Sequence, residues 1–243
     1  MTGAVISKRV GDCLHVTLSR PDKLNAFNAE LVEGLHGAVQ MAADVEARAV
    51  IFQGDGRGFS GGFDLSALDD ESDGDLLYRF VRVEQLLQSV AHAPFATIAC
   101  VHGPCYGAAA DLVAACQSRI GTASARFRMP GAFFGLVLGT GRLAALVGAD
   151  HARQLVQRPK PFGAEEAVET GFLTAIVEDV EWETWIEQRM AHVRMFDAMT
   201  YANMSARQRV DTRSTDLETL VNSVTSSSIK ARIQAYVSSL NLE

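Results

Sequence analysis

The chain has 243 residues, of which 48% are hydrophobic, enough for one domain with a sizeable core and a smaller appendage. Its formal net charge of -7 argues against nucleic acid as the main partner, because phosphate binding requires a basic surface. We see no apolar run long enough to cross a bilayer and no signal or transit peptide, so we expect a cytoplasmic protein without a membrane partner. Reduced, packed thiols without metal-ligand spacing are expected at Cys13, Cys100, Cys105 and Cys116.

In chain order, the patterns predict a β-hairpin over 4–18 that turns at Gly11-Asp12, and then a loop over 20–27. Asn28 is a plausible N-cap for a helix over 30–43, whose apolar residues recur with helical spacing. Strands are expected at 48–53, 95–101 and 119–122, and helices at 76–91, from Gly107 onward, and at 140–147, 149–157 and 163–170. Alternating strands and helices predict an α/β core.

Two polar regions complete this outline. The acidic segment over 69–75 is expected to be a solvated, mobile loop. The tail over 181–241 shows no strand pattern and is expected to form helices with polar faces.

The most informative segment is 102–112, His-Gly-Pro-Cys-Tyr-Gly-Ala-Ala-Ala-Asp-Leu. It predicts a strand, a tight turn at Gly103 and Gly107, and a helix whose first amides have no partner within the helix. Such amides, together with the helix dipole, favour a developing negative charge. Alone, the pattern also fits an ordinary strand-to-helix turn.

A second glycine-rich turn follows the strand at 48–53, with the sequence Arg-Gly-Phe-Ser-Gly-Gly-Phe-Asp-Leu over 57–65. Two amide-presenting turns in one domain can direct two N–H groups at one oxygen. We therefore expect an oxyanion hole.

The chain at this point resembles the crotonase (enoyl-CoA hydratase/isomerase) superfamily. The likeness runs to about residue 177 and is carried by several segments in the family's order: 18–28, 59–65, 102–114, 126–130 and 135–141. The resemblance implies an α/β spiral of ββα repeats over 1–185, which would hold the acyl-CoA site. Residues 186–243 would then be a C-terminal helical region that drives assembly into a homotrimer or a dimer of trimers.

The resemblance also implies a mechanism in which two backbone amides hold the thioester oxygen of an acyl-CoA and stabilise an enolate. The matching positions are Phe63 and Ala108, and the Phe63 ring is expected to shape the acyl pocket. The family usually has glycine at the second position. Alanine fits there if residue 108 lies in the first helical turn, where φ is negative.

The acid/base residues depart from the family pattern. Hydratases of this family use two glutamates, and the matching positions here are Asp111 and Gly131. Asp111 is either the sole acid/base group, acting through a water, or a structural group near the helix start. Glu84, with Arg82 nearby, could enter the pocket from the helix over 76–91, or it could face water. The space at Gly131 could admit an anion or a substrate carboxylate.

For the CoA portion, the resemblance implies contacts along the loop from Arg20 through Lys23, Leu24 and Ala26, and along the stretch that ends at Asp64 and Leu65. Arg20 and Lys23 either pair with phosphates or are solvated surface charges. Lys230 and Arg232 match positions where the C-terminal helix of the family contributes cations. Arg142 could close the pocket or cap a helix, and His102 is expected to orient the loop. The remaining substrate-binding candidates are Gly61, Gly62, Tyr106 and Gly107, and Cys105 is a further pocket candidate.

The sequence therefore predicts an acyl-CoA-processing enzyme of fatty acid metabolism, nominally an enoyl-CoA hydratase/isomerase. It would need no cofactor beyond the CoA of its substrate and no metal. The alternative is a crotonase-like CoA-thioester binder or scaffold that has lost the two-glutamate chemistry. A protease function is discarded, because no Ser/His/Asp order lies in the matching places.

Overall fold

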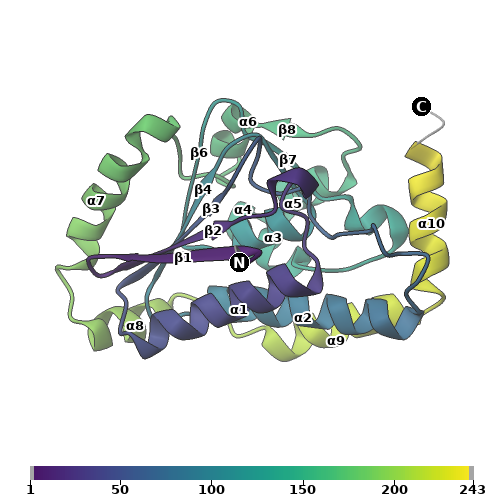
Figure 1. Cartoon of the computed structure of the whole chain (residues 1–243), viewed down its shortest axis with the longest axis horizontal. Helices are drawn as coiled ribbons and strands as arrows, with labels where there is room; N and C mark the ends of the chain where they lie inside the picture. Colours follow the sequence, from purple (N-terminus) through teal and green to yellow (C-terminus); the bar gives the residue numbers. More distant parts are fainter. Residues whose placement is uncertain (1–2, 241–243) are drawn as a thin grey trace.

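In the computed structural model, which describes residues 3–240, a six-stranded sheet forms the centre of the fold (Figure 1). The strand order is β1-β2-β3-β4-β6-β9, with β1 antiparallel to β2 and every other pair parallel. The strands span Val5–Val10 (β1), Cys13–Leu18 (β2), Ala49–Gly54 (β3), Ala96–Val101 (β4), Ser118–Gly121 (β6) and Ala175–Ile176 (β9). The predicted hairpin and α/β architecture are confirmed.

Both faces of the inner strands β3, β4 and β6 are buried, and alternate residues of these strands serve opposite faces of the sheet. On β3, Val50 and Phe52 join the core under the first helices, whereas Ala49 and Ile51 join a separate core on the other side. Each of the four is fully buried. Continuous burial of this kind is typical of a parallel sheet covered by helices on both faces.

Helices α1 (Ala29–Asp44), α2 (Asp73–Ala91) and α3 (Ala108–Ala115) contribute to the first core. As predicted, Asn28 caps α1, and its side chain accepts a hydrogen bond from the Leu31 amide at 2.9 Å.

The expectation of a mobile loop over 69–75 is wrong for its second half. Ser72 and Asp75 form a reciprocal capping box at the start of α2. Asp73 and Asp75 lie in the first turn of this helix, where negative side chains complement the helix dipole.

A smaller three-stranded sheet lies beside the first and was not predicted. It consists of β5 (Pro104–Tyr106), β7 (Arg126–Arg128) and β8 (Phe162–Gly163). These strands are too short for a periodic pattern to reveal them. After β7 the chain continues through a 3-10 helix, η2 (Pro130–Phe134), and then α4 (Thr140–Val147), α5 (Ala149–Gln157) and α6 (Ala164–Glu169).

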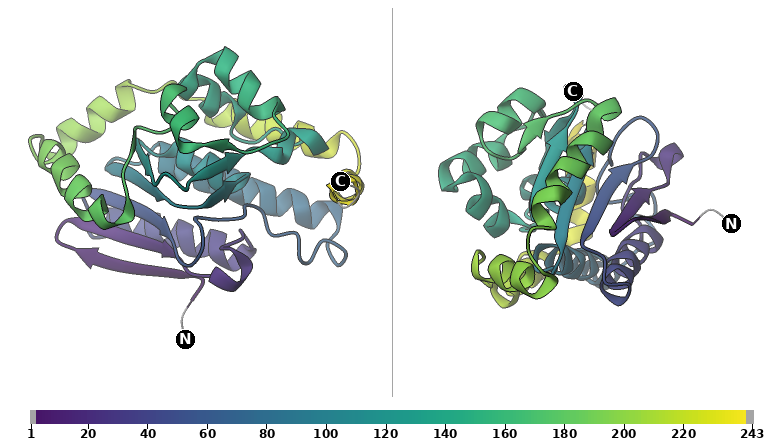
Figure 2. Two further views of the ribbon diagram at one scale, coloured as in Figure 1. Left: turned by 90° about the horizontal axis from the view of Figure 1, so that it is seen from above. Right: turned by 90° about the vertical axis from the view of Figure 1, so that its left-hand side faces the viewer.

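The C-terminal helices separate into two groups, one at an end of the molecule and one that runs along α2 toward the opposite end (Figures 1 and 2). Helices α7 (Trp182–Val193) and α8 (Ala198–Arg207) cover the second face of the large sheet. Helices α9 (Arg213–Thr225) and α10 (Ile229–Leu240) instead pack against α2 and η2. The boundary expected at residue 185 falls inside α7. The tail packs on the rest of the fold through both groups of helices. Among residues 3–240, we find no helix with the length and apolar character that a membrane span requires.

Candidate active site

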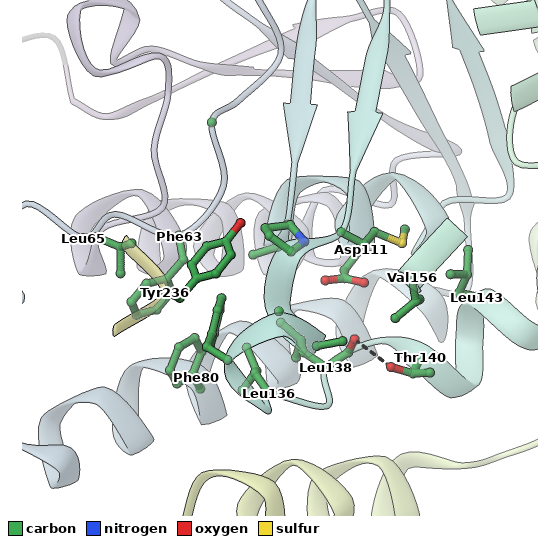
Figure 3. Close-up of a pocket in the computed structure, with 18 residues that line it drawn as sticks. Phe63, Leu65, Phe80, Asp111, Leu136, Leu138, Thr140, Leu143, Val156 and Tyr236 are labelled. Carbon is green, nitrogen blue, oxygen red and sulfur yellow. Dashed lines mark hydrogen bonds between the residues drawn. The ribbon is translucent and has the colours of Figure 1, made fainter. Parts of the chain in front are cut away.

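A cavity of about 130 Å³ lies between the two glycine-rich turns, η2, the start of α4 and α10 (Figure 3). Most of its lining is apolar, and the side chains come from distant parts of the chain. The lining residues are Gly61, Phe63, Leu65, Phe80, Gly107, Ala108, Asp111, Met129, Pro130, Gly131, Ala132, Phe134, Leu136, Leu138, Thr140, Leu143, Val156 and Tyr236. An enclosed apolar space with few polar groups is typical of a small-molecule site.

The two turns lie side by side at this cavity. A parallel bridge joins Ser60 to Cys105, in which the Ser60 amide donates to Pro104 O at 3.0 Å and the Tyr106 amide donates to Ser60 O at 3.0 Å. Gly62 has a φ of 89°, and a Cβ at this position would collide with the carbonyl oxygen of Tyr106. Only glycine permits this backbone conformation and this close approach together. The turns are therefore locked in a mutual register.

Within residues 3–240, neither the Phe63 amide nor the Ala108 amide donates a hydrogen bond. The Gly62 carbonyl accepts from the Phe27 amide at 2.7 Å. Because N–H and C=O point in opposite directions across a trans peptide bond, the Phe63 N–H points away from Phe27. Ala108 is the first residue of α3, so its N–H projects from the helix N-terminus. Both residues line the same cavity, as an oxyanion hole requires.

Asp111 follows on α3, and its carboxylate points into the cavity (Figure 3). The residue is 7% exposed, and no hydrogen-bond donor within residues 3–240 pairs with its carboxylate. A Cβ at Gly139 would collide with this carboxylate, so the N-cap of α4 packs directly against it. Burial raises the pKa of Asp111 from 3.8 to about 8, against an opposing effect of the Arg142 guanidinium. The carboxyl group is therefore mostly protonated at neutral pH.

Gly131 lines the cavity from η2. A Cβ at this position would meet Leu136 at 3.5 Å, which is ordinary van der Waals contact. The position can thus accommodate a side chain, but this chain places no acid there. Among the described lining residues, Asp111 carries the only carboxyl group.

Glu84 is buried, at 1% exposure, but it does not line the cavity. Its carboxylate forms a two-point ion pair with the Arg142 guanidinium, which also contacts Asp216 at 2.9 Å. Helical periodicity could place Glu84 on a buried face of α2, but only the tertiary structure shows that this face meets α4 and α9. Arg142 accordingly neither closes the pocket nor caps a helix.

The loop over 20–26 lies against the Phe63 turn. Arg20 donates to the Asp64 carboxylate at 3.0 Å and also to the carbonyl of Ala26. A Cβ at Gly61 would meet the Leu24 side chain at 3.4 Å, so Leu24 packs on that turn. Of the residues that the resemblance assigns to CoA, Leu65 lines the cavity, whereas the loop over 20–26 and Asp64 do not. The Arg20 charge is already paired.

Other expected contact residues lie outside the cavity wall. Lys23 is exposed at the end of a short 3-10 helix (Pro21–Lys23), and Lys230 donates to the backbone carbonyls of Asp69 and Glu71. Tyr106 does not line the cavity, although its carbonyl lies against Gly62, and Cys105 is fully buried. As expected, His102 holds its loop, with Nε2 2.8 Å from Gly56 O.

Sequence reasoning missed two aromatic residues of the cavity wall. Phe80 of α2 stacks on the Phe63 ring, with centroids 4.3 Å apart. Tyr236 of α10 lies near Leu65 in Figure 3. The helical pattern of α2 could have indicated that Phe80 is buried, but no local signal connects Tyr236 to a turn that is more than a hundred residues earlier.

These features define a class of protein: an α/β fold in which two free amides and one buried carboxyl group meet at an apolar cavity. The sequence model of the family described as enoyl-CoA hydratase/isomerase matches residues 10–242. The chain therefore belongs to the enoyl-CoA hydratase/isomerase (crotonase) superfamily.

Individual relatives agree with this assignment. A probable enoyl-CoA hydratase of Rhodobacter capsulatus is 34% identical over 192 residues, which cover 77% of this chain and 74% of the relative. A probable enoyl-CoA hydratase of Mycobacterium bovis is 31% identical over 175 residues, covering 71% and 70%. A solved enoyl-CoA hydratase/isomerase family structure from Bordetella parapertussis superposes with a TM-score of 0.95 at 40% identity, covering 97% of this chain and 99% of that chain.

Proposed function

We propose that the protein binds an acyl-CoA thioester, stabilises its enolate with the Phe63 and Ala108 amides, and moves one proton with Asp111. The observation that carries this proposal is the meeting of two free amides with a single carboxyl group of raised pKa. A thioester fits because its carbonyl oxygen gains negative charge when the α-carbon loses a proton. Each such amide donor contributes about 3 kcal/mol to transition-state stabilisation.

The one-carboxyl arrangement favours double-bond isomerisation over hydration. In an isomerisation, one group removes a proton from the α-carbon and returns it two carbons further along, so no second acid is consumed. A pKa of about 8 suits this role, because a group that takes and returns a proton works best near the operating pH. Hydration by the family's two-glutamate route would need a second carboxyl group at Gly131, which has none.

The lining supports an uncharged, apolar acyl group. Apart from Asp111, the polar side chains of the described wall are those of Thr140 and Tyr236. The Thr140 hydroxyl is directed at Leu138 O, at 3.5 Å. Burial of an ionised acyl tail here would leave that charge without a cationic partner, which is costly.

For the CoA portion we propose contacts along the loop over 20–26 and along Asp64-Leu65. Lys23 supports phosphate binding better than the other cations of this region, because Arg20 is paired with Asp64 and Lys230 is held by two carbonyls. We also propose the homotrimer or dimer of trimers that the family resemblance implies. Exposed apolar side chains, such as Met195 just before α8 and Met199 within it, support an additional protein interface.

Hydrogen exchange at the acyl α-carbon tests the proposal directly. Butyryl-CoA incubated with the enzyme in D₂O should gain deuterium at this carbon, as mass spectrometry of the thioester would show. Asp111→Asn should reduce the exchange rate at least ~100-fold, because general acid/base groups contribute about that much. Asp150→Asn, at an exposed site on α5, is the matched control. If a broad panel of acyl-CoA compounds binds without exchange or turnover, the binder or scaffold alternative replaces this proposal.

A further inference from the structure

We propose that Arg79 of α2 is a positioning residue, which holds the Phe63 turn so that its amide faces the substrate oxygen. This inference rests on the proposed oxyanion hole and concerns a side chain outside the cavity wall. The Arg79 side chain is 12% exposed, and its contacts converge on the residues that flank Phe63.

One guanidinium nitrogen of Arg79 joins two separate backbone segments. Nη2 of Arg79 donates to Phe27 O at 3.1 Å and to Asp64 O at 2.8 Å. Phe27 is the residue that bridges Phe63, donating its amide to Gly62 O at 2.7 Å and accepting from the Asp64 amide at 3.2 Å. Arg79 therefore holds Phe27, the bridge partner of Phe63, together with Asp64, the residue that follows Phe63.

The same guanidinium also packs on the Phe63 side chain. Its Cζ lies 4.0 Å from the Phe63 ring centroid, within the range of a cation–π contact. The Phe80 ring stacks on Phe63 as well. Rotation of the peptide that carries the Phe63 N–H would have to break the hydrogen bond from the Phe27 amide to Gly62 O and disturb this packing.

The orientation of Arg79 is itself fixed by a two-oxygen ion pair. Nη1 lies 2.7 Å from each carboxylate oxygen of Glu71. The Glu71 carbonyl accepts from Lys230 Nζ at 2.8 Å, which ties the arrangement to α10. A planar guanidinium can satisfy a carboxylate and two carbonyls at once, whereas the three donors of a lysine ammonium cannot reproduce that fixed geometry.

The test measures carbonyl polarisation and exchange kinetics in parallel. The probe is butyryl-CoA labelled with ¹³C at the thioester carbonyl, and its infrared C=O stretch is compared free and bound. We expect wild type to lower this frequency and Arg79→Gln to lose most of the shift. In the exchange assay, kcat for Arg79→Gln should fall about 10- to 100-fold, since a small misplacement of a reacting group has such effects, while KM changes less than about twofold.

Two further variants separate positioning from general destabilisation. Arg79→Lys should recover part of the carbonyl shift, and Glu71→Gln should lose part of it with Arg79 still present. Arg82→Gln is the matched control, because Arg82 lies on the same helix but pairs with Glu33 at the surface. It should leave both readouts unchanged.

The outcomes distinguish this proposal from the proposed function. If wild type polarises the carbonyl and Arg79→Gln does so equally, the role of Arg79 is wrong and the proposed function stands. If wild type binds butyryl-CoA without any polarisation, both are wrong. A parallel fall in the kcat of Arg82→Gln would also overturn the inference, because the effect would then not be specific to the Phe63 turn.

Discussion

The protonation state of Asp111 can be read from protein stability, independently of any substrate. Asp111→Asn replaces the carboxyl group with a neutral amide of nearly the same size. In the folded wild type, burial raises the pKa of Asp111 to about 8, whereas the unfolded chain has the ordinary value of 3.8. Between these two values the folded state binds more protons than the unfolded state. The unfolding free energy of wild type must therefore fall as pH rises through this window.

The magnitude follows from the pKa difference of about 4 units. Each unit corresponds to ~1.36 kcal/mol, so the wild type should lose about 3 kcal/mol relative to Asp111→Asn between pH 5 and pH 7. The loss should level off above pH 8. Other titrating groups are common to both proteins, so they cancel in the difference.

Urea unfolding at several pH values between 5 and 9, at one fixed protein concentration, measures this difference. Asp150→Asn controls for the removal of a carboxylate, because that side chain is 87% exposed. A stability gap between wild type and Asp111→Asn that stays constant from pH 5 to pH 8 would refute the reasoning. Asp111 would then be ionised in the folded protein, and the argument from burial would fail.

Two further predictions concern the ion-pair network and the assembly. Arg142→Met leaves the buried Glu84 carboxylate without its main partner, so urea unfolding should show a loss of about 3–5 kcal/mol. The double variant Arg142→Met/Glu84→Leu should recover much of this unfolding free energy. A loss below about 1 kcal/mol for Arg142→Met alone would contradict the buried pairing. Light scattering should give the mass of three 26.2 kDa chains, or six for a dimer of trimers. A monomeric mass at micromolar concentration would contradict the proposed assembly.

Local patterns in the sequence were sufficient to predict the elements that form from neighbouring residues. The hairpin of β1 and β2, the Asn28 cap and the boundaries of α4 and α5 agree with their predicted positions. The two glycine-rich turns belong to this category, because Gly62 and Gly107 adopt positive φ values that other residues rarely accept. Since each turn follows a strand of one parallel sheet, their meeting at one edge was also predictable.

Only the tertiary structure decided which side chains surround those turns. Helical periodicity indicates which face of α2 is buried, but it does not name the neighbour that covers it. Glu84 thus forms an ion pair with Arg142, whereas Phe80 lines the cavity. Tyr236 reaches the same wall through the packing of α10 on α2 and η2.

For Asp111 too, the sequence determines one property and the tertiary structure another. A carboxyl group near the start of the small-residue helix is a property of the sequence. Its raised pKa is not, because desolvation depends on the residues that exclude water from it. Gly139 of the α4 N-cap, 28 positions later in the chain, packs against that carboxylate. Residue order therefore determined the turns and the acid, and long-range packing decided the acid's protonation and the shape of the cavity.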